Sequence, residues 1–451
     1  MTIQLSKFFK ILFIFFVFLL PFHALIITTL KCKFEIDTNV IRFWKEGLVI
    51  LLLFVTIIDI FLKKKSINGL LKGNYLVGVT ITFIFSSLVF IGFPYFEFKV
   101  SNFLGFKYDV FFLFCMLLGI YLNFIKDNFK TLLYTIFISG FTSIAIFLPW
   151  YIFGDISALS DIFGYSNKVS TYKANTCISF SQNVEGGHHR FQGTFGSPIN
   201  MSIFFVVFYI IYVGLILSKN YENKQKTIAY ILIPSLFVLP SIFFSYSKTS
   251  ILGLAFGASI FTYLSVKFIF KKSFKKSQIY VVYGLLLIAF IGLVIAKKDL
   301  FLHLDAILNR LENLIRSLEM FRYNPIGYGL GVAGPASQIG RSIESLGNWQ
   351  IIAQSTSHTA LFLPENWYIQ ILLEQGIFGF SIFISLFLII GFKLFDIIKK
   401  KKDFLSIGIF SSFVGICFMC LFCHALEDAG IVYPLFMIIG SYIALNLKLN
   451  D

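Results

Sequence analysis

Residues 366–392, NWYIQILLEQGIFGFSIFISLFLIIGF, form a polar start that runs directly into a long apolar segment. A helix needs about 20 apolar residues to cross a hydrocarbon core of roughly 30 Å. Runs of this kind recur along the chain, which is 57% hydrophobic and only 14% charged. They are too long for the alternating strands of a β-barrel. The sequence therefore predicts an all-α, polytopic integral membrane protein.

We expect about twelve membrane spans within a single polytopic domain, residues 1–451. The first apolar run is long and lacks a small-residue cleavage site, so we interpret it as a membrane helix and not as a secretion signal. The expected spans are 8–30, 46–62, 70–92, 104–125, 130–153, 199–218, 226–244, 249–270, 279–296, 366–392, 404–424 and 428–447.

The lysines indicate the orientation of these spans. With a cytoplasmic N-terminus, the short lysine-rich segments at 63–65, 126–130, 219–226, 267–276 and 393–402 all face the cytoplasm. This distribution follows the positive-inside rule. The net charge of +15 is thus explained mainly by topology, and we expect no nucleic-acid partner.

On this topology all six arginines fall in outer segments. The arginine side chain binds phosphate or carboxylate through a planar two-pronged geometry that lysine lacks. The pattern indicates an outward-facing site for a phosphorylated or acidic ligand, and interfacial anchoring is the alternative. The arginines are Arg42, Arg190, Arg310, Arg316, Arg322 and Arg341.

Two large outer loops, 154–198 and 297–365, are the expected location of function. The second contains LDAILNRLENLIRSLEMF (304–321), whose apolar residues have helical spacing. That pattern predicts an amphipathic helix that lies on the bilayer or covers a cavity.

The arginines of this helix differ in their local charge environment. Arg316 has Glu312 four residues before it and Glu319 three residues after it, so it is expected to be neutralised. Arg310 has no acid at these spacings and is expected to be freer to bind an external anion. The glycine-rich turn NPIGYGLG (324–331) could bring backbone N–H groups against a phosphate or sugar, or form a flexible loop.

Several segments together carry a family resemblance. They are RFQGTFGSPIN (190–200), SYSKTSILGL (245–254), NRLENLIRSLEMFRYNPIGYGLG (309–331) and ENWYIQILLEQGIFG (365–379), with a fainter match at LGFKYD (104–109). Because these segments occur together and in this order, the chain resembles the O-antigen ligase and O-antigen polymerase superfamily of bacterial envelope glycosyltransferases.

The chain also departs from that family's pattern. Lys248 and Lys107 stand where relatives carry arginine, and Glu365 stands where the ligases carry a functionally central histidine. His358 lies seven residues earlier and is a second candidate for that role. The loss of the histidine favours the polymerase branch for O-antigen or capsule repeat units.

The resemblance implies an inverting glycosyl transfer between undecaprenyl-diphosphate-linked oligosaccharides in the bilayer, on the outer face of the bacterial cytoplasmic (inner) membrane. It also implies a chain-length regulator and a flippase as partners. No nucleotide-binding motif is present, and we expect neither a cofactor nor a metal.

This reaction needs cations around the leaving diphosphate. On the resemblance, Arg190 and Arg310 are the first candidates, and Arg316, Lys248 and Lys107 are secondary substrate-binding candidates.

The reaction also needs a base for the attacking hydroxyl. Glu365, at an outer helix end, is the expected base, and helix capping or pairing with an arginine is its alternative role. Asn366 and Tyr368 are expected to hold sugar hydroxyls, although Tyr368 also fits an interfacial aromatic.

Other polar and small residues have structural interpretations. Glu374, within the span, is expected to pair with a polar group of another helix, and Gly376 and Gly379 are expected to allow close packing. The polar group His424, Glu427 and Asp428 either lines the same cavity or caps two helices. Cys32 and Cys177 lie on the outer side, where oxidation is permitted.

Two alternatives to a polymerase remain. A ligase or another oligosaccharyltransferase would share the mechanism and differ in the acceptor. A lipid-linked oligosaccharide flippase or transporter would place charged groups near the bilayer midplane in broken helices, whereas the candidates here cluster in outer loops.

Overall fold

The computed structural model describes residues 2–38, 40–62, 75–91, 100–121, 129–154, 161–165, 181–183, 189–220, 223–270, 304–339 and 364–447. Almost all of the regular structure in these ranges is helical, as the long apolar runs require. The all-α class predicted from the sequence is confirmed, with one short β-hairpin in addition.

The described part of the N-terminal half is built from long helices joined by short helical segments. They are α1 (Thr2–Leu19), η1 (Leu20–Phe22), α2 (His23–Thr28), η2 (Thr29–Lys33), η3 (Ile41–Phe43), α3 (Trp44–Leu62), α5 (Tyr75–Val89), α6 (Val100–Tyr121), α8 (Phe129–Phe153) and, after the hairpin, α10 (Pro198–Asn220). The hairpin pairs β1 (Ser181–Asn183) antiparallel to β2 (His189–Phe191), within the first expected outer loop.

The second half begins with α11 and ends with α20. Its helices are α11 (Lys224–Phe244), α12 (Lys248–Ser265), η4 (Val266–Phe270), α15 (Leu304–Tyr323), α16 (Gly334–Ile339), α18 (Trp367–Lys401), α19 (Phe404–Met419) and α20 (Ala429–Leu447). The predicted amphipathic helix is thus present as α15, inside the second expected outer loop.

The number of spans differs from the expected twelve. Within the described ranges, 8 helices are long and apolar enough to cross a membrane, and Tyr75–Val89 and Phe404–Met419 are shorter apolar helices. The expected span 279–296 lies outside the described residues. An apolar run of about 20 residues in the sequence does not fix helix length, because caps and breaks end a helix earlier.

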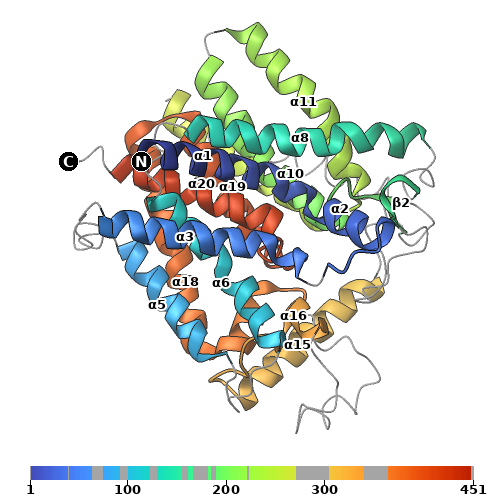
Figure 1. Ribbon diagram of the computed structural model, residues 1–451, viewed down its shortest axis with the longest axis vertical. Coiled ribbons are helices and arrows are strands. Elements are labelled where there is room, and N and C mark those ends of the chain that lie inside the picture. Colours follow the sequence, from blue (N-terminus) through green and yellow to red (C-terminus); the bar gives the residue numbers. More distant parts are fainter. Residues whose placement is uncertain are drawn as a thin grey trace.

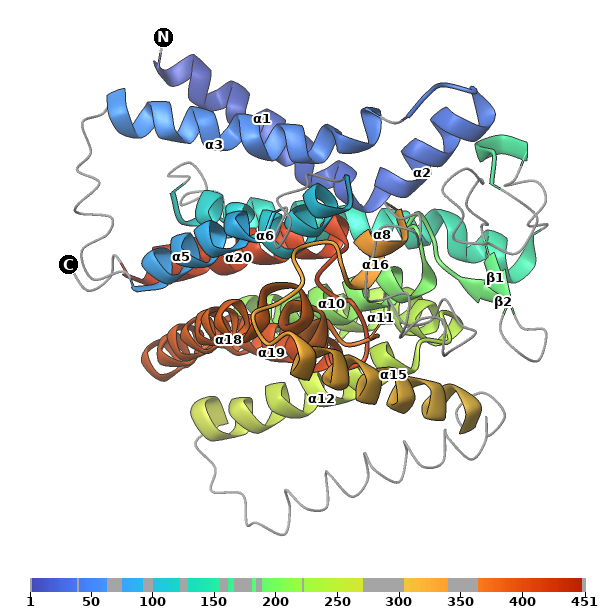
Figure 2. The ribbon, with the colours of Figure 1, turned by 90° about the horizontal axis from the view of Figure 1, so that it is seen from below.

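The helices form a bundle in which segments distant in sequence lie side by side. α20 packs along α6, α10 packs along α19, and α18 contacts both α5 and α19. The two chain ends lie on one side of the molecule, and the hairpin and α2 lie on the opposite side (Figures 1 and 2). This arrangement fits the expected topology, in which both termini face one side and the large loops face the other.

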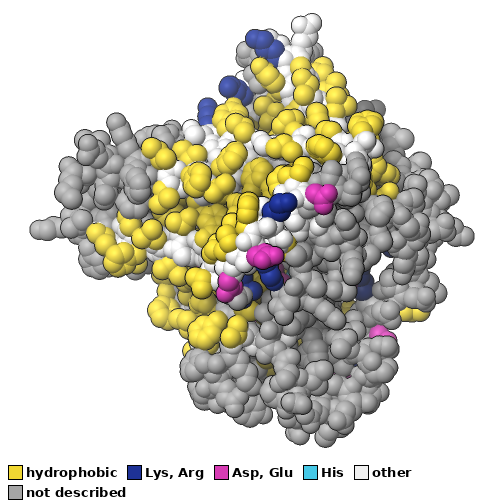
Figure 3. Space-filling view, turned by 45° about the vertical axis from the view of Figure 1, so that its right-hand side comes forward, with side chains coloured by type: hydrophobic (Ala, Val, Ile, Leu, Met, Phe, Trp, Pro, Cys, Tyr) yellow, Lys and Arg dark blue, Asp and Glu magenta, His cyan; other side chains and the backbone are white. Residues whose placement is uncertain are grey.

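The surface reflects the membrane environment. Large hydrophobic side chains cover most of the described surface in one view, and the charged side chains there are collected in a few small groups (Figure 3). Inside, aromatic residues such as Trp367, Phe112 and Phe383 are fully buried and in ring contact with one another. The interior is therefore packed by aromatic side chains drawn from α6 and α18.

α18 is interrupted at Gly376, whose φ of 61° and ψ of −168° lie outside the helical region. The loop after α15 forms the backbone hydrogen bonds that the helix loses at this break. The Tyr328 N–H donates to Leu373 O (2.9 Å), the Gly329 N–H donates to Glu374 O (2.9 Å), and the Ile377 N–H donates to a loop carbonyl. The backbone groups that the helix loses are thus satisfied by a loop, which a segment inside a bilayer requires.

The glycines of this loop serve close backbone approach. A Cβ on Gly331 would lie 2.0 Å from Ser101 O, and one on Gly327 would lie 2.6 Å from Gly376 N. The amides at 328, 329 and 330 donate to protein carbonyls. The phosphate cradle considered for NPIGYGLG is therefore wrong for these three amides, because α18 and the end of α5 occupy them.

We expect Gly376→Ala to destabilise the protein by about 2 kcal/mol or more, because its backbone conformation disfavours L side chains. Its Cβ would also meet Ile326 O at 2.1 Å. Gly78→Ala is the control, since nothing lies within 4 Å of that Cβ. Thermal unfolding of the detergent-solubilised variants measures the difference, and equal melting temperatures would contradict the role of the break.

Candidate functional site

Arg310 and Glu365 form an ion pair at the outer end of α18. Arg310 Nε lies 2.5 Å from Glu365 Oε2, and the two side chains are 48% and 43% exposed. The pairing with an arginine that was considered as an alternative role for Glu365 is therefore observed. Local spacing on α15 cannot reveal this partner, because Glu365 reaches the helix from a distant part of the chain. The pair is accessible, so an incoming anion can compete for the arginine.

Arg316 is neutralised within its own helix, as predicted. Its guanidinium is paired with Glu312 one turn earlier. The apolar residues Leu308, Leu311 and Ile315 remain at least half exposed, which fits a helix lying on a membrane surface. Arg316 is thus a weaker candidate for ligand binding than Arg310.

Asn366 and Tyr368 both have structural hydrogen bonds. Asn366 Oδ1 accepts from the Ile369 N–H (3.1 Å) and caps α18. Tyr368 Oη donates to Cys417 O on α19 (2.8 Å). The capping role that the sequence analysis considered for Glu365 is taken by Asn366. Contacts with sugar hydroxyls remain a prediction for both side chains, which retain limited hydrogen-bonding capacity.

Arg190 joins two of the segments that carry the family resemblance. It lies on β2, and its Nε donates to Ser245 O (2.8 Å) in the turn between α11 and α12. Lys248 begins α12 at the same turn. The fold thus brings Arg190 and Lys248 to one corner, whereas Arg310 belongs to the corner formed by α15 and α18.

Lys107 belongs to a buried charged cluster that connects α3, α6 and α2. Lys107 Nζ lies 3.0 Å from Glu46 Oε1, and Lys45 Nζ lies 3.6 Å from the same oxygen. Lys45 Nζ also lies 2.8 Å from His23 Nε2, and the Trp44 indole donates to His23 Nδ1. Of these residues, only Lys107 was predicted from the sequence as a candidate. The Lys-Glu pair at the start of the apolar run could have indicated a buried charged cluster.

Glu374 has the structural pairing expected of it. A side-chain hydrogen bond joins it to Asp109 on α6, which requires a proton on one of the two carboxyls. Glu374 Oε1 also accepts from the Ala333 N–H (3.0 Å), and Gln375 Nε2 donates to Asp109 Oδ2 (3.0 Å). Ser87 on α5 donates to Gln375 Oε1. This fully buried network locks α5, α6 and the interrupted α18 together.

The polar group at 424–428 divides into two roles. Asp428 Oδ1 accepts from the Gly430 N–H (2.7 Å) at the start of α20, which is the capping role considered from the sequence. Asp428 Oδ2 accepts from Asn200 Nδ2 (2.6 Å). Glu427 instead points toward Gln370 and Lys107. Asn200, at the end of RFQGTFGSPIN, thereby ties the first resemblance segment to this loop.

The cysteines confirm one sequence expectation. Cys32, on the expected outer side, is disulfide-bonded, and Cys115, Cys417, Cys420 and Cys423 are free. Cys177 and the candidate His358 lie outside the described residues. Gly376 allows the close packing expected of it, although the partner is the Ile326 backbone of a loop.

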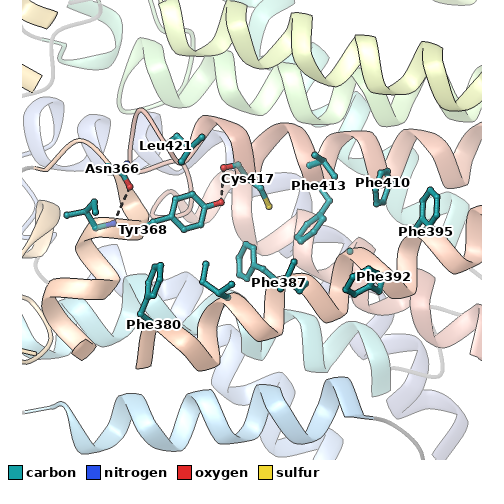
Figure 4. Close-up of a pocket in the computed structure, with 15 residues that line it drawn as sticks. Asn366, Tyr368, Phe380, Phe387, Phe392, Phe395, Phe410, Phe413, Cys417 and Leu421 are labelled. Carbon is teal, nitrogen blue, oxygen red and sulfur yellow. Dashed lines mark hydrogen bonds between the residues drawn. The ribbon is translucent and has the colours of Figure 1, made fainter. Parts of the chain in front are cut away.

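An apolar groove of about 670 Å³ lies between α18 and α19. Figure 4 shows its aromatic lining, with Phe380, Phe387 and Phe392 from α18 facing Phe413 of α19. Its polar end carries Asn366, next to the ion-paired Glu365. A groove that is apolar along its length and begins beside a charged pair has the character of a site for a lipid chain with a polar head.

Residues 233–384 match the family described as O-antigen ligase. This part of the chain is similar to that family. The match spans α12, α15, α16 and the interrupted part of α18, and thus contains Arg310, Glu365 and the repaired break. It supports the O-antigen ligase and polymerase superfamily that the motifs indicate. It does not distinguish a ligase from a polymerase. No curated protein matches the chain.

We expect Glu46→Gln to destabilise the protein by about 3–5 kcal/mol, because it leaves the buried cations Lys45 and Lys107 without their carboxylate. The control is Glu312→Gln, which removes an exposed intrahelical pair with Arg316 and should cost about 1 kcal/mol or less. Thermal unfolding in the same detergent measures both. Equal losses of stability would show that the buried cluster is not held by Glu46.

Proposed function

We propose that the protein is a polysaccharide polymerase that transfers a glycan between undecaprenyl-diphosphate-linked oligosaccharides, building O-antigen or capsule chains at the outer face of the cytoplasmic membrane. The observation that carries the proposal is the accessible Arg310–Glu365 pair within the region that matches the O-antigen ligase family. Glu365 directly precedes Asn366, which lines the apolar groove. A cation beside a lipid-sized groove suits a lipid diphosphate.

The leaving diphosphate gains charge as the glycosidic bond breaks, so a preorganised cation stabilises the transition state. Arg310 is suited to this role because its present partner is half exposed and replaceable. A diphosphate oxygen pair can occupy both prongs of the guanidinium and displace Glu365. Glu365, the base expected from the sequence, is occupied by this ion pair before the substrate binds.

Arg190 and Lys248 supply a second cationic corner at the turn between α11 and α12. Arg190 uses Nε for the bond to Ser245 O, which fixes the plane of its guanidinium. Two corners suit a reaction with two lipid-linked substrates, one that donates the growing chain and one that accepts it. Lys107, buried against Glu46, is better suited to hold the loop at 420–428 by its charge.

The orientation of the site has independent support from Cys32. A disulfide forms and persists in an oxidising compartment, and Cys32 follows the first membrane helix. With the N-terminus in the cytoplasm, this cysteine and the loops that carry Arg190 and Arg310 lie outside. An outer-face glycan polymerase of this kind would work with a flippase that delivers its substrate and a regulator of chain length.

The residue at position 365, at the start of ENWYIQILLEQGIFG, favours a polymerase over a ligase. Glu365 stands where the ligases carry histidine. Because Glu365 pairs with Arg310, a histidine there would not provide the same charge. An oligosaccharyltransferase with a different acceptor remains the alternative within the superfamily.

The interrupted α18 is the feature that most favours a transporter, since transporters bind ions at broken helices. Here the carbonyls of Leu373 and Glu374 accept loop amides, and the Glu374 carboxyl is bonded to Asp109 and Ala333. These groups are committed to protein contacts, so the break supports the loop and provides no open ion site at these atoms.

We expect Arg190→Ala and Arg310→Ala each to reduce polymer formation by about 100-fold or more, because each removes a cation from the leaving diphosphate. The assay is chain extension by purified protein supplied with an undecaprenyl-diphosphate-linked repeat unit, resolved as a ladder. Arg322→Ala, on the exposed end of α15, is the matched control and should form a normal ladder.

Normal ladders from both arginine variants would refute the assignment of the cationic sites. Absence of a ladder from the unchanged protein, combined with transfer to a lipid A core acceptor, would identify a ligase. Membrane insertion and melting temperature are compared in parallel, so that loss of folding is not mistaken for loss of chemistry.

We expect Val414→Trp, which fills the groove between α18 and α19, to raise the KM for a long-tailed polyprenyl substrate by about 10-fold. A substrate with a short isoprenoid tail should be affected much less, because it does not extend along the groove. Phe85→Trp, on the exposed face of α5, is the control. Equal effects on both tail lengths would contradict the groove as a lipid site.

A further inference from the structure

The chemistry proposed above needs a base, and Glu365 is bound to Arg310. A second carboxyl, Glu427, lies in the short segment between α19 and α20. The Trp367 N–H at the start of α18 donates to Cys420 O in the same segment (2.9 Å). This bond fixes the segment against the helix end that carries Glu365.

Cys423 connects the two charged groups in space. The charges of Arg310, Glu365 and Glu427 all act on its thiol, so the three side chains lie within electrostatic range of Cys423. Glu427 therefore belongs to the same outer corner as the ion pair, although it lies in a different loop and outside the region that matches the family.

Glu427 has an oxygen without a donor. Its Oε1 is enclosed and has no hydrogen-bond partner, while the Gln370 side chain of α18 faces the carboxyl within hydrogen-bonding range. The side chain as a whole is partly exposed, unlike that of Glu374, which is fully buried. An unpaired enclosed carboxyl oxygen is costly, and a hydroxyl donor is the group that would satisfy it.

The electrostatic surroundings suit proton transfer. Burial raises the pKa of the Glu427 carboxyl well above its ordinary value, and the Gln370 side chain and the charge of Lys107 oppose that shift. A base is most effective when its pKa lies near the working pH. Burial lowers the pKa of His424 to about 4, so this neighbour is neutral and leaves the Glu427 charge uncompensated from that side.

We propose that Glu427 accepts the proton of the attacking sugar hydroxyl, and that Glu365 serves to hold Arg310 until the diphosphate binds. This assignment rests on the proposed glycosyl transfer. The hydroxyl oxygen forms a bond to the anomeric carbon, the bond from that carbon to the diphosphate oxygen breaks, and the diphosphate leaves with the electron pair. The hydroxyl proton passes to the Glu427 carboxylate and then to solvent.

Titratable groups face Glu427 from two helices and from its own loop. Those on α6 are Lys107, Tyr108 and Asp109, the one on α18 is Glu374, and those in the loop are Cys420, Cys423 and His424. Asp109 and Glu374 are hydrogen-bonded to each other and are fully buried. Glu427, in contrast, is partly exposed.

The test measures kcat and KM against pH for the full-length protein with the undecaprenyl-diphosphate-linked repeat unit. Because a base must be ionised, wild-type kcat should fall as the pH drops through the raised pKa of Glu427. Glu427→Gln should lower kcat by about 100-fold or more and remove this dependence, with little change in KM. Glu365→Gln should change mainly KM and keep the acidic fall in kcat.

Adding formate to the Glu427→Ala variant distinguishes a catalytic role of Glu427 from a structural role. Formate should restore part of kcat in this variant and not in Glu365→Ala, because a small carboxylate can replace a missing base but cannot replace a structural contact. Glu319→Gln, an exposed carboxyl on α15, is the control with unchanged kcat.

The outcomes separate this proposal from the proposed function. Unchanged kcat in Glu427→Gln, or loss of the acidic fall in Glu365→Gln instead, would overturn the assignment of the base while leaving the polymerase intact. No glycan transfer by the unchanged protein would overturn the proposed function itself.

Discussion

The interruption of α18 at Gly376 is the constraint on which the rest of the site depends. A broken helix inside a bilayer leaves backbone groups that hydrocarbon cannot satisfy, and the loop at 325–329 satisfies them. The repair holds that loop, which follows α15, against α18. Because α15 carries Arg310 and the start of α18 carries Glu365, the position of the ion pair follows from this backbone pairing.

Buried polar side chains reinforce the same arrangement. The bonds of Glu374 to Asp109 and to the loop amide of Ala333 join α6, α18 and the loop. A carboxyl with these partners is held in one position, because losing either contact would leave a polar group unpaired in a low-dielectric interior. The network is therefore structural, whereas Glu365 and Glu427 at the outer corner are partly exposed.

The chemistry assigned to this corner depends on differences in environment between similar groups. Glu365 is half exposed and faces an arginine, Glu374 is fully buried and bonded, and Glu427 is enclosed with an oxygen that lacks a donor. Three glutamates within one region thus have three roles, a separation that depends on burial and partners and not on residue type. An apolar groove between α18 and α19 begins at Asn366, the residue that follows Glu365.

The sequence by itself determined the class of fold, the amphipathic α15, the local pairing of Arg316 and the family resemblance, because each depends on neighbours within a few residues or on composition. It could not determine the partner of Arg310, the commitment of the loop amides to α18, or the cluster of His23, Lys45 and Lys107. Those depend on contacts between segments far apart in the chain, which hydropathy and spacing do not encode. Only the tertiary structure decided which carboxyl is paired with an arginine, which is fully buried and which keeps an oxygen without a hydrogen-bond partner.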